Sequence, residues 1–118
     1  MRRQPLRVIV CGGRDFADSE HVWRVLGDLD DEYGISAVAH GGAAGADSEA
    51  GKWATAMRKS VQVYHARWKQ EGKAAGPLRN QRMLDQFKPD AVVAFPGGCG
   101  TADMVRRAVE SGVRVVKA

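Results

Sequence analysis

The residues best suited to chemistry lie in three glycine-rich stretches, each placed directly after a short apolar run. The stretches are Gly12-Gly13-Arg14-Asp15, Gly41-Gly42-Ala43-Ala44-Gly45 and Gly97-Gly98-Cys99-Gly100-Thr101. Glycine lets the backbone approach a ligand closely, and the free amides that open a following helix attract phosphate. Tight turns also need glycine, but three such turns in one chain favour a phosphate-binding pocket.

Polar residues in or just after these stretches are placed to complete the pocket, and each has a structural alternative. Arg14 and Asp15 directly follow a glycine pair, so they either contact the ligand or form a solvated turn. Asp47 either caps a helix or accepts a hydrogen bond from a ribose hydroxyl. Thr101 serves as an N-cap, as a phosphate ligand or as both.

A third group of candidates opens a predicted helix. Asn80 shares a helical face with apolar Met83 and Phe87, so its amide points inward and needs partners, either a neighbouring loop or the ligand. Arg79 beside it can meet a phosphate with its planar guanidinium. The predicted ligand-binding residues are therefore Gly12, Gly13, Arg14, Asp15, Gly41, Gly42, Gly45, Asp47, Arg79, Asn80, Gly97, Gly98, Gly100 and Thr101.

Strands and helices alternate strictly along the chain, which indicates the fold class. Short β-branched runs predict strands at residues 6–11, 35–40, 61–64, 90–95 and 113–116. Helical spacing predicts helices at residues 19–33, 46–59, 78–87 and 101–111, with 66–76 as the longest irregular stretch. The pattern predicts a Rossmann-like α/β three-layer sandwich, with a central parallel sheet of about five strands and helices on both faces. A ligand then lies beyond the carboxyl ends of the strands.

Composition fits a small globular protein with an anionic ligand. The 118 residues predict one domain over 1–118, and the net charge of +4 suits phosphate. Cys11, Cys99 and the three histidines have no metal-ligand spacing, so no metal site is predicted. The first apolar run is too short for a signal peptide or a membrane span, so we expect a cytoplasmic location and no membrane contact.

Other patterns narrow the function further. Neither G-x-G-x-x-G nor G-x-x-x-x-G-K-[ST] occurs, which disfavours an ordinary dinucleotide dehydrogenase and a Walker-type ATPase. Trp23 and Trp53 lie in predicted helices and are expected in the core. Trp68 lies in the irregular stretch and is a candidate to stack on a base.

Four segments together resemble the motifs of the YspA/YpsA-related SLOG family. They occur in order over nearly the whole chain, at Gly12–Phe16, His40–Asp47, Gly76–Met83 and Pro96–Met104. The resemblance implies a Rossmann-like fold that binds a nucleotide or a nucleotide-derived ligand, as a sensor or processing module. The wider superfamily includes the DNA-processing protein DprA and the LOG (lysine decarboxylase-like) enzymes, which release a base from nucleoside monophosphates.

The resemblance to LOG enzymes leaves open whether the chain is an enzyme. Pro96–Thr101 is similar to the first part of the LOG motif, but Met104 stands where that motif has its catalytic glutamate. A thioether cannot replace a carboxylate, so binding ranks above N-glycosidic hydrolysis. The catalytic candidates are Asp47, Arg79 and Asp103, and Arg79 or Arg82 corresponds to the LOG arginine.

The resemblance also suggests partners. LOG enzymes imply a homodimer, while DprA and the positive charge give single-stranded nucleic acid as a second alternative. The basic residues that favour nucleic acid form only a loose cluster, at Lys69, Lys73, Arg79 and Arg82. No cofactor is predicted beyond the nucleotide-type ligand, with magnesium left as an open alternative.

Overall fold

The computed structural model describes residues 4–118, so residues 1–3 of the predicted domain lie outside the described residues. Its strands are β1 (Leu6–Cys11), β2 (Ile35–His40), β3 (Ser60–Val63), β4 (Ala91–Ala94) and β5 (Arg114–Lys117). They form a five-stranded sheet in the order β3-β2-β1-β4-β5, and every neighbouring pair is parallel. The chain therefore crosses to the other side of the central strand, β1, between β3 and β4.

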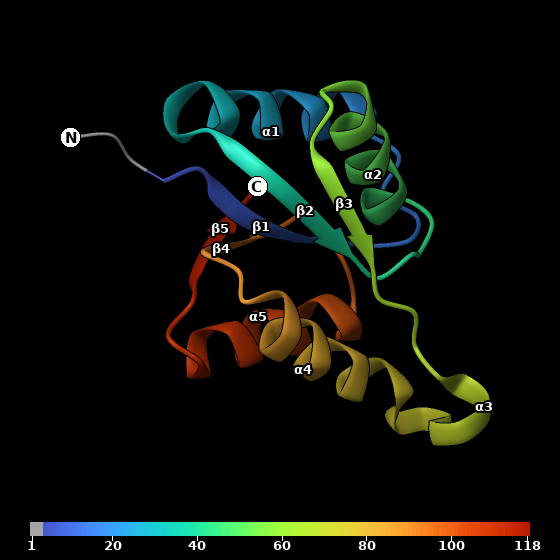
Figure 1. Ribbon diagram of the computed structural model, residues 1–118. Helices are drawn as coiled ribbons and strands as arrows, with labels where there is room; N and C mark the ends of the chain where they lie inside the picture. The colour runs from blue at the N-terminus through green and yellow to red at the C-terminus, as the bar shows by residue number, and fades with distance from the viewer. Residues whose placement is uncertain (1–3) are drawn as a thin grey trace.

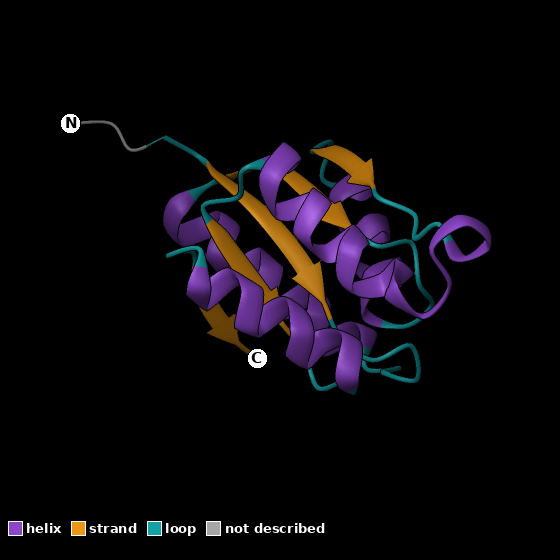
Figure 2. Cartoon of the chain, turned by 90° about the horizontal axis from the view of Figure 1, so that it is seen from below, coloured by secondary structure: helices purple, strands orange, loops and turns teal. Residues whose placement is uncertain are grey.

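Helices cover both faces of this sheet, as predicted. They are α1 (Ser19–Tyr33), α2 (Ala46–Ala56), α3 (Trp68–Glu71), α4 (Ala75–Phe87) and α5 (Cys99–Glu110). Figure 1 shows α1 and α2 on one face and α4 and α5 on the other, while α3 lies away from the sheet. Figure 2 views the molecule from below and shows the helices of the second face in front of the strands. The Rossmann-like α/β sandwich is confirmed.

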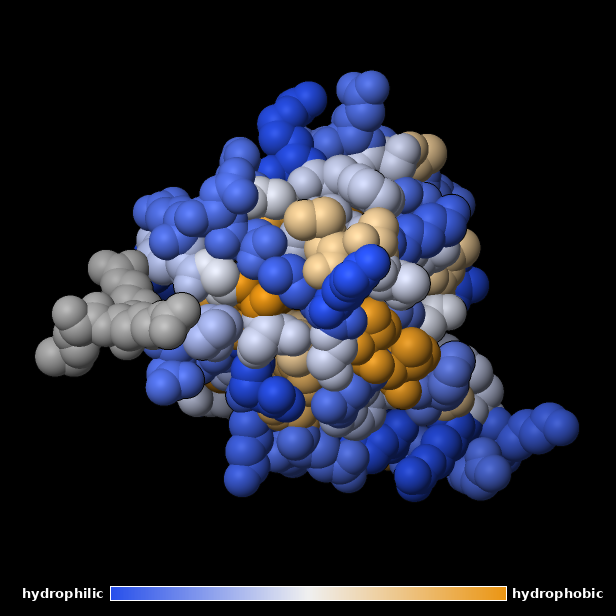
Figure 3. Space-filling model, turned by 45° about the horizontal axis from the view of Figure 1, so that its top comes forward, coloured by the Kyte–Doolittle hydropathy of each residue, from blue (hydrophilic) through white to orange (hydrophobic). Residues whose placement is uncertain are grey.

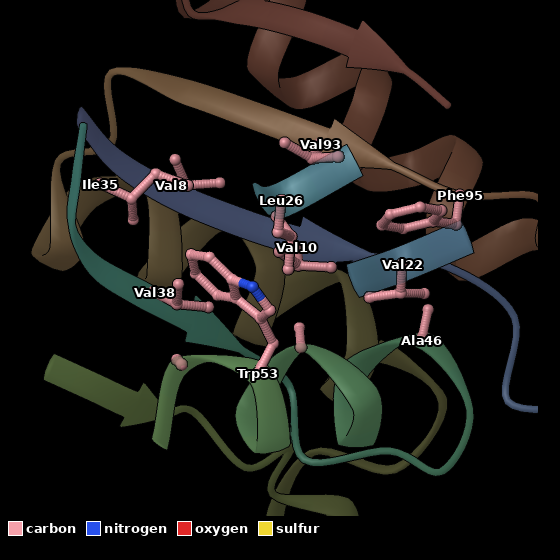
Figure 4. Close-up of a cluster of buried hydrophobic side chains, with 12 residues drawn as sticks. Val8, Val10, Val22, Leu26, Ile35, Val38, Ala46, Trp53, Val93 and Phe95 are labelled. Atoms are coloured by element: carbon pink, nitrogen blue, oxygen red, sulfur yellow. The ribbon is translucent and has the colours of Figure 1, made fainter. Parts of the chain in front are cut away.

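Each face of the sheet has its own apolar core, because alternate residues of a strand point to opposite faces. Val8 and Val10 of β1 face α1 and α2, where Trp53 lies across them (Figure 4). Ile9 and Cys11 of the same strand pack with Met83 and Met104, among others, from α4 and α5. From Val8 to Cys11 the central strand is thus apolar, because these residues are buried on both sides of the sheet.

Two helices begin earlier than the sequence predicted, and both lie beside the strand ends. Helix α4 begins at Ala75, because Gly76-Pro77 fits the first turn, where a missing N–H costs nothing. Helix α5 begins at Cys99 with Gly98 as its N-cap, so the prediction that Thr101 is the N-cap is wrong. The stretch predicted to be irregular holds α3 and a 3-10 turn at Gly72–Ala74.

The burial of the tryptophans differs in part from the prediction. Trp53 is 2% exposed and belongs to the core as expected, but Trp23 is 40% exposed. The buried stripe of α1 runs through Val22 and Leu26, and Trp23 lies about 100° further round the helix. Trp68 is also exposed.

Polar side chains cover most of the face shown in Figure 3, and apolar side chains show between them at several places. Within residues 4–118, no helix combines the length and the apolar character needed to cross a bilayer.

Candidate functional site

The three glycine-rich loops meet at the carboxyl edge of the sheet. Gly13 N donates to Pro96 O at 2.8 Å, and Ala46 N donates to Gly13 O at 3.4 Å. The loop after β1 is thereby joined to the loop after β4 and to the start of α2. Between these loops and α4 lies a cavity of about 170 Å³.

All but four of the predicted ligand-binding residues line this cavity, the exceptions being Asp15, Gly42, Gly45 and Gly97. Val10, Cys11, Ala43 and Met83 line it as well and were not predicted. They are core or loop residues whose types carry no chemical signal, and only the packing of the sheet brings them to the cavity floor.

Several of the glycines are explained by close packing between loops. A Cβ atom on Gly12 would lie 2.6 Å from the Cβ of Ala46, and one on Gly41 would collide with the guanidinium of Arg79. Gly45 has a φ of +76° and lies against Gly13 O, where a side chain would not fit. For these positions the structure supports the structural alternative.

Gly98 and Gly100 are different. A Cβ atom at either position would meet nothing within 4 Å among the described residues, and Gly98 has an ordinary φ of −98°. Helix α5 has no side-chain cap, and Ala102 N is bonded to Gly98 O. The amides of residues 99–101 therefore have no intrahelical acceptor, and Gly98, Gly100 and Thr101 line the cavity.

Asp47 braces the loop after β2. Its Oδ2 accepts hydrogen bonds from Gly41 N at 2.9 Å and from Ala43 N at 3.3 Å. Both amides precede α2, whose N-cap is Gly45, so the prediction that Asp47 caps its own helix is wrong. Asp47 is only 6% exposed and lines the cavity, and its Oδ1 has no hydrogen-bond partner in residues 4–118.

Burial raises the pKa of Asp47 above its ordinary value of 3.8, while the two amides and the charge of Arg79 oppose the rise. The same low-dielectric surroundings raise the pKa of Cys11 to about 12, with a further contribution from the charge of Asp47. Cys11 is therefore a neutral thiol and not a nucleophile at physiological pH.

Arg79 is held by the backbone of two loops. Its Nη1 donates to Gly41 O at 2.9 Å and to Tyr64 O at 3.1 Å, and its Nε donates to Asn80 Oδ1 at 3.0 Å. Burial lowers the pKa of Arg79, and Asp47 opposes that shift. Its Nη2 has no hydrogen-bond partner in the described part of the chain, and Arg79 lines the cavity.

Asn80 links the two helices of this face. Its Nδ2 donates to Gly100 O at 3.2 Å and to Asp103 Oδ2 at 3.0 Å. The amide was correctly predicted to point inward, and its partners are protein atoms. Asn80 thus fixes the start of α5 against α4 beside the cavity.

Asp103 and Met104 lie outside the cavity lining. Asp103 also accepts from Arg107 Nε and Arg106 Nη2, each at 2.9 Å. Although burial opposes the shift, the hydrogen bonds from Asn80 and Arg107 lower the pKa of Asp103. Met104 is fully buried in the core beneath α5. Of the catalytic candidates, only Asp47 and Arg79 line the cavity.

The remaining candidates lie at the margin or elsewhere. Arg14 is exposed at the cavity, Thr101 lines it, and Trp68 does not. The basic cluster is divided, because Arg79 is turned to the loops and Arg82 donates to His65 O at 2.8 Å. Within the described chain, no three His, Cys, Asp or Glu residues are grouped closely enough to hold a metal ion.

The strand order defines a Rossmann-like α/β fold, with the cavity at the point where the strand order reverses. The sequence pattern of the YspA, cpYpsA-related SLOG family matches residues 6–70. The chain is also 38% identical over 119 residues to Gene 61 protein of Mycobacterium phage D29, an alignment that covers 93% of this chain and 94% of the phage protein. No solved structure matches the chain. The protein therefore belongs to the YspA, cpYpsA-related SLOG family.

Proposed function

We propose that this protein binds a nucleotide or a nucleotide-derived ligand, with a phosphate on the N-terminus of α5 and a ribose beside Asp47. Membership of the SLOG family suggests a nucleotide-related function. The observation that carries the proposal is the open space in front of Gly98 and Gly100, at the uncapped start of a helix that borders the cavity.

The start of α5 supplies what a phosphate needs. Three amides without intrahelical acceptors and the positive end of the helix dipole favour an anion. Thr101 can donate its hydroxyl hydrogen, and Nη2 of Arg79 adds a charged donor from α4. Arg14 reaches the same cavity from the loop after β1.

Asp47 sets the orientation of the ligand. A carboxylate repels phosphate but accepts hydrogen bonds from sugar hydroxyls, and its Oδ1 has no partner in residues 4–118. The phosphate therefore lies toward α5 and the sugar toward α2. Cys11 and Met83 give the sugar ring an apolar floor.

The experiment compares Gly98→Asp with Gly98→Asn by calorimetric titration of ribose 5-phosphate and AMP. Both side chains cap a helix, so each variant should keep its fold and gain a few tenths of a kcal/mol in the free energy of unfolding. The Asp carboxylate repels phosphate and the Asn amide does not. We expect Gly98→Asp to bind at least about tenfold more weakly than Gly98→Asn.

If the two variants bind the probes equally well, the phosphate lies elsewhere and the proposal is wrong. Thermal unfolding of both variants without ligand provides the control for folding. A wild-type protein that binds neither compound would also overturn the proposal.

One observation keeps N-glycosidic hydrolysis as a second candidate. Asp47 is a buried carboxylate in the cavity with a raised pKa, a setting in which carboxylates act on glycosidic bonds. Chromatographic detection of free adenine from AMP tests this directly. Release that Asp47→Asn abolishes would establish the hydrolase, and binding without release would leave the protein a binding module.

A further inference from the structure

A second hollow lies on the other side of the α5 N-terminus. It has a volume of about 450 Å³ and is bounded by the loop after β4, the end of β5 and the first two turns of α5. It shares two lining residues, Gly98 and Thr101, with the cavity that holds Asp47. The proposed phosphate position therefore lies between two spaces.

The cavity beside Asp47 is small for a complete nucleotide. Ligand sites usually enclose roughly 300–1,000 Å³, and the 170 Å³ beside Asp47 falls below that range. Adding the 450 Å³ of the second hollow brings the site into the middle of the range. The cavity beside Asp47 thus suits a sugar phosphate better than a complete nucleotide.

The second hollow has the chemistry of a nucleobase site. Pro96, Ala102 and Val105 contribute apolar walls, Lys117 and Arg106 lie at its rim, and no acidic side chain lines it. Arg106 is paired with Asp103 and Glu110, whereas Lys117 has no ion-pair partner in the described residues. Lys117 is therefore available to a ring nitrogen or to a phosphate oxygen.

We propose that this hollow takes the nucleoside half of a diphosphate-linked ligand. The diphosphate crosses the N-terminus of α5, and the sugar beyond it lies beside Asp47. Ligands of Rossmann-like sheets lie in the same way, across the point where the strand order reverses. The inference rests on the proposed function and narrows its ligand to the class of nucleoside diphosphate sugars, for which ADP-ribose is the probe.

The first test compares three probes on the wild-type protein by calorimetric titration. Ribose 5-phosphate and AMP each place one sugar phosphate beside Asp47 and leave the second hollow without a nucleoside, whereas ADP-ribose fills both spaces. We expect ADP-ribose to bind at least about tenfold more tightly than either smaller probe. Equal affinity for AMP and ADP-ribose would overturn the inference while leaving the proposed function in place.

The second test fills the hollow with a side chain. Ala102 is exposed on α5 and lines only this hollow, so Ala102→Phe should remove the advantage of ADP-ribose and leave ribose 5-phosphate within about twofold of wild type. Val109→Phe is the matched control, because Val109 is exposed on the same helix and lines neither space.

The outcomes of this second test separate the two levels of the proposal. Unchanged ADP-ribose affinity in Ala102→Phe shows that the hollow is unused and overturns the inference. Equal losses in both phenylalanine variants, with ribose 5-phosphate weakened as well, would assign the effect to α5 as a whole and overturn it too. Failure of every probe on wild type overturns the proposed function itself.

Discussion

Arg79 and Asn80 each hold the backbone of a loop that lies far away in the sequence. Arg79 bonds to Gly41 O, 38 residues earlier, and Asn80 to Gly100 O, 20 residues later. Together with Asp47, these side chains fix the loops before any ligand arrives. The loops therefore lose their conformational freedom when the chain folds and not when the ligand binds, which leaves more of the contact energy for affinity.

A hydrogen bond in the loop after β2 depends on the protonation state of His40. Its Nδ1 accepts a hydrogen bond from Gly42 N at 3.0 Å, which requires the neutral ring with its proton on Nε2. Gly51 makes room for the ring, because a Cβ there would lie 2.9 Å from Nε2. Burial lowers the pKa of His40 below 6.5, and the nearby charges of His65 and Arg79 add to the shift.

We predict that His40 makes the protein less stable as the pH falls below 6.5. Below that value the unfolded chain binds a proton that the folded ring resists, until the pH passes the lower folded pKa. His40→Asn keeps an acceptor near the Nδ1 position but does not titrate. The free energy of unfolding of wild type and of His40→Asn is measured in urea from pH 8 to pH 5. The wild type should lose more of this free energy than His40→Asn as the pH falls. Parallel curves for the two proteins would contradict the prediction.

At the scale of elements, α5 is the helix to which our proposal assigns phosphate binding. Its N-terminus is uncapped, its first turn contains Gly100, and it borders both spaces of the site. A glycine inside a helix costs roughly 0.5–1 kcal/mol relative to alanine. Under the proposed function, a side chain at Gly100 would reduce the space for the phosphate.

Two glycine-to-alanine variants test this view of α5. Gly100 and Gly27 both lie in helices, and a Cβ at either would meet nothing within 4 Å. Gly27→Ala should gain roughly 0.5–1 kcal/mol in the free energy of unfolding, and Gly100→Ala should gain less, because Gly100 is the second residue of its helix. Only Gly100→Ala should weaken binding of AMP in a calorimetric titration. If Gly27→Ala weakens it equally, the effect comes from general stiffening and not from the site.

The elements were predictable from the sequence to a useful degree, and the contacts between them were not. Apolar runs and helical spacing located every strand and the main helices, and the inward position of Asn80 followed from its helical face. The start of α5 was misplaced because Gly98 and Gly100 look like loop residues by composition. Trp23 was misplaced because its size predicts burial while its position on α1 does not.

The site shows the same limit. Its glycine loops were found because a parallel sheet brings all carboxyl ends to one edge. The helix-capping alternative for Asp47 was wrong, because a carboxylate near a helix start can accept from its own helix or from the preceding loop equally well. The bonds of Arg79 to Gly41 and Tyr64 depend on how α4 packs, and no local pattern records that.

At the scale of the whole molecule, the proposed ligand contacts one edge of the sheet and leaves the rest untouched. Hydrogen exchange followed by mass spectrometry, with and without AMP, tests this distribution. We expect protection in peptides covering residues 11–16, 41–47 and 97–102, and unchanged exchange in β3 and α3. Protection centred on α3 would instead place the ligand on the segment that carries Trp68.

The order of the strands also determines when β1 can pair with its partners during synthesis of the chain. Strand β1 pairs with β4, and Arg7 exchanges backbone and side-chain bonds with Asp90, 83 residues later. At roughly 5–20 residues per second, a ribosome needs on the order of ten seconds to deliver that partner. During this time one edge of the central strand β1 is unpaired, a state that favours aggregation with other chains. The proposed ligand site, which needs Asp47 from the early half and Gly98 from the late half, is complete only when this interval ends.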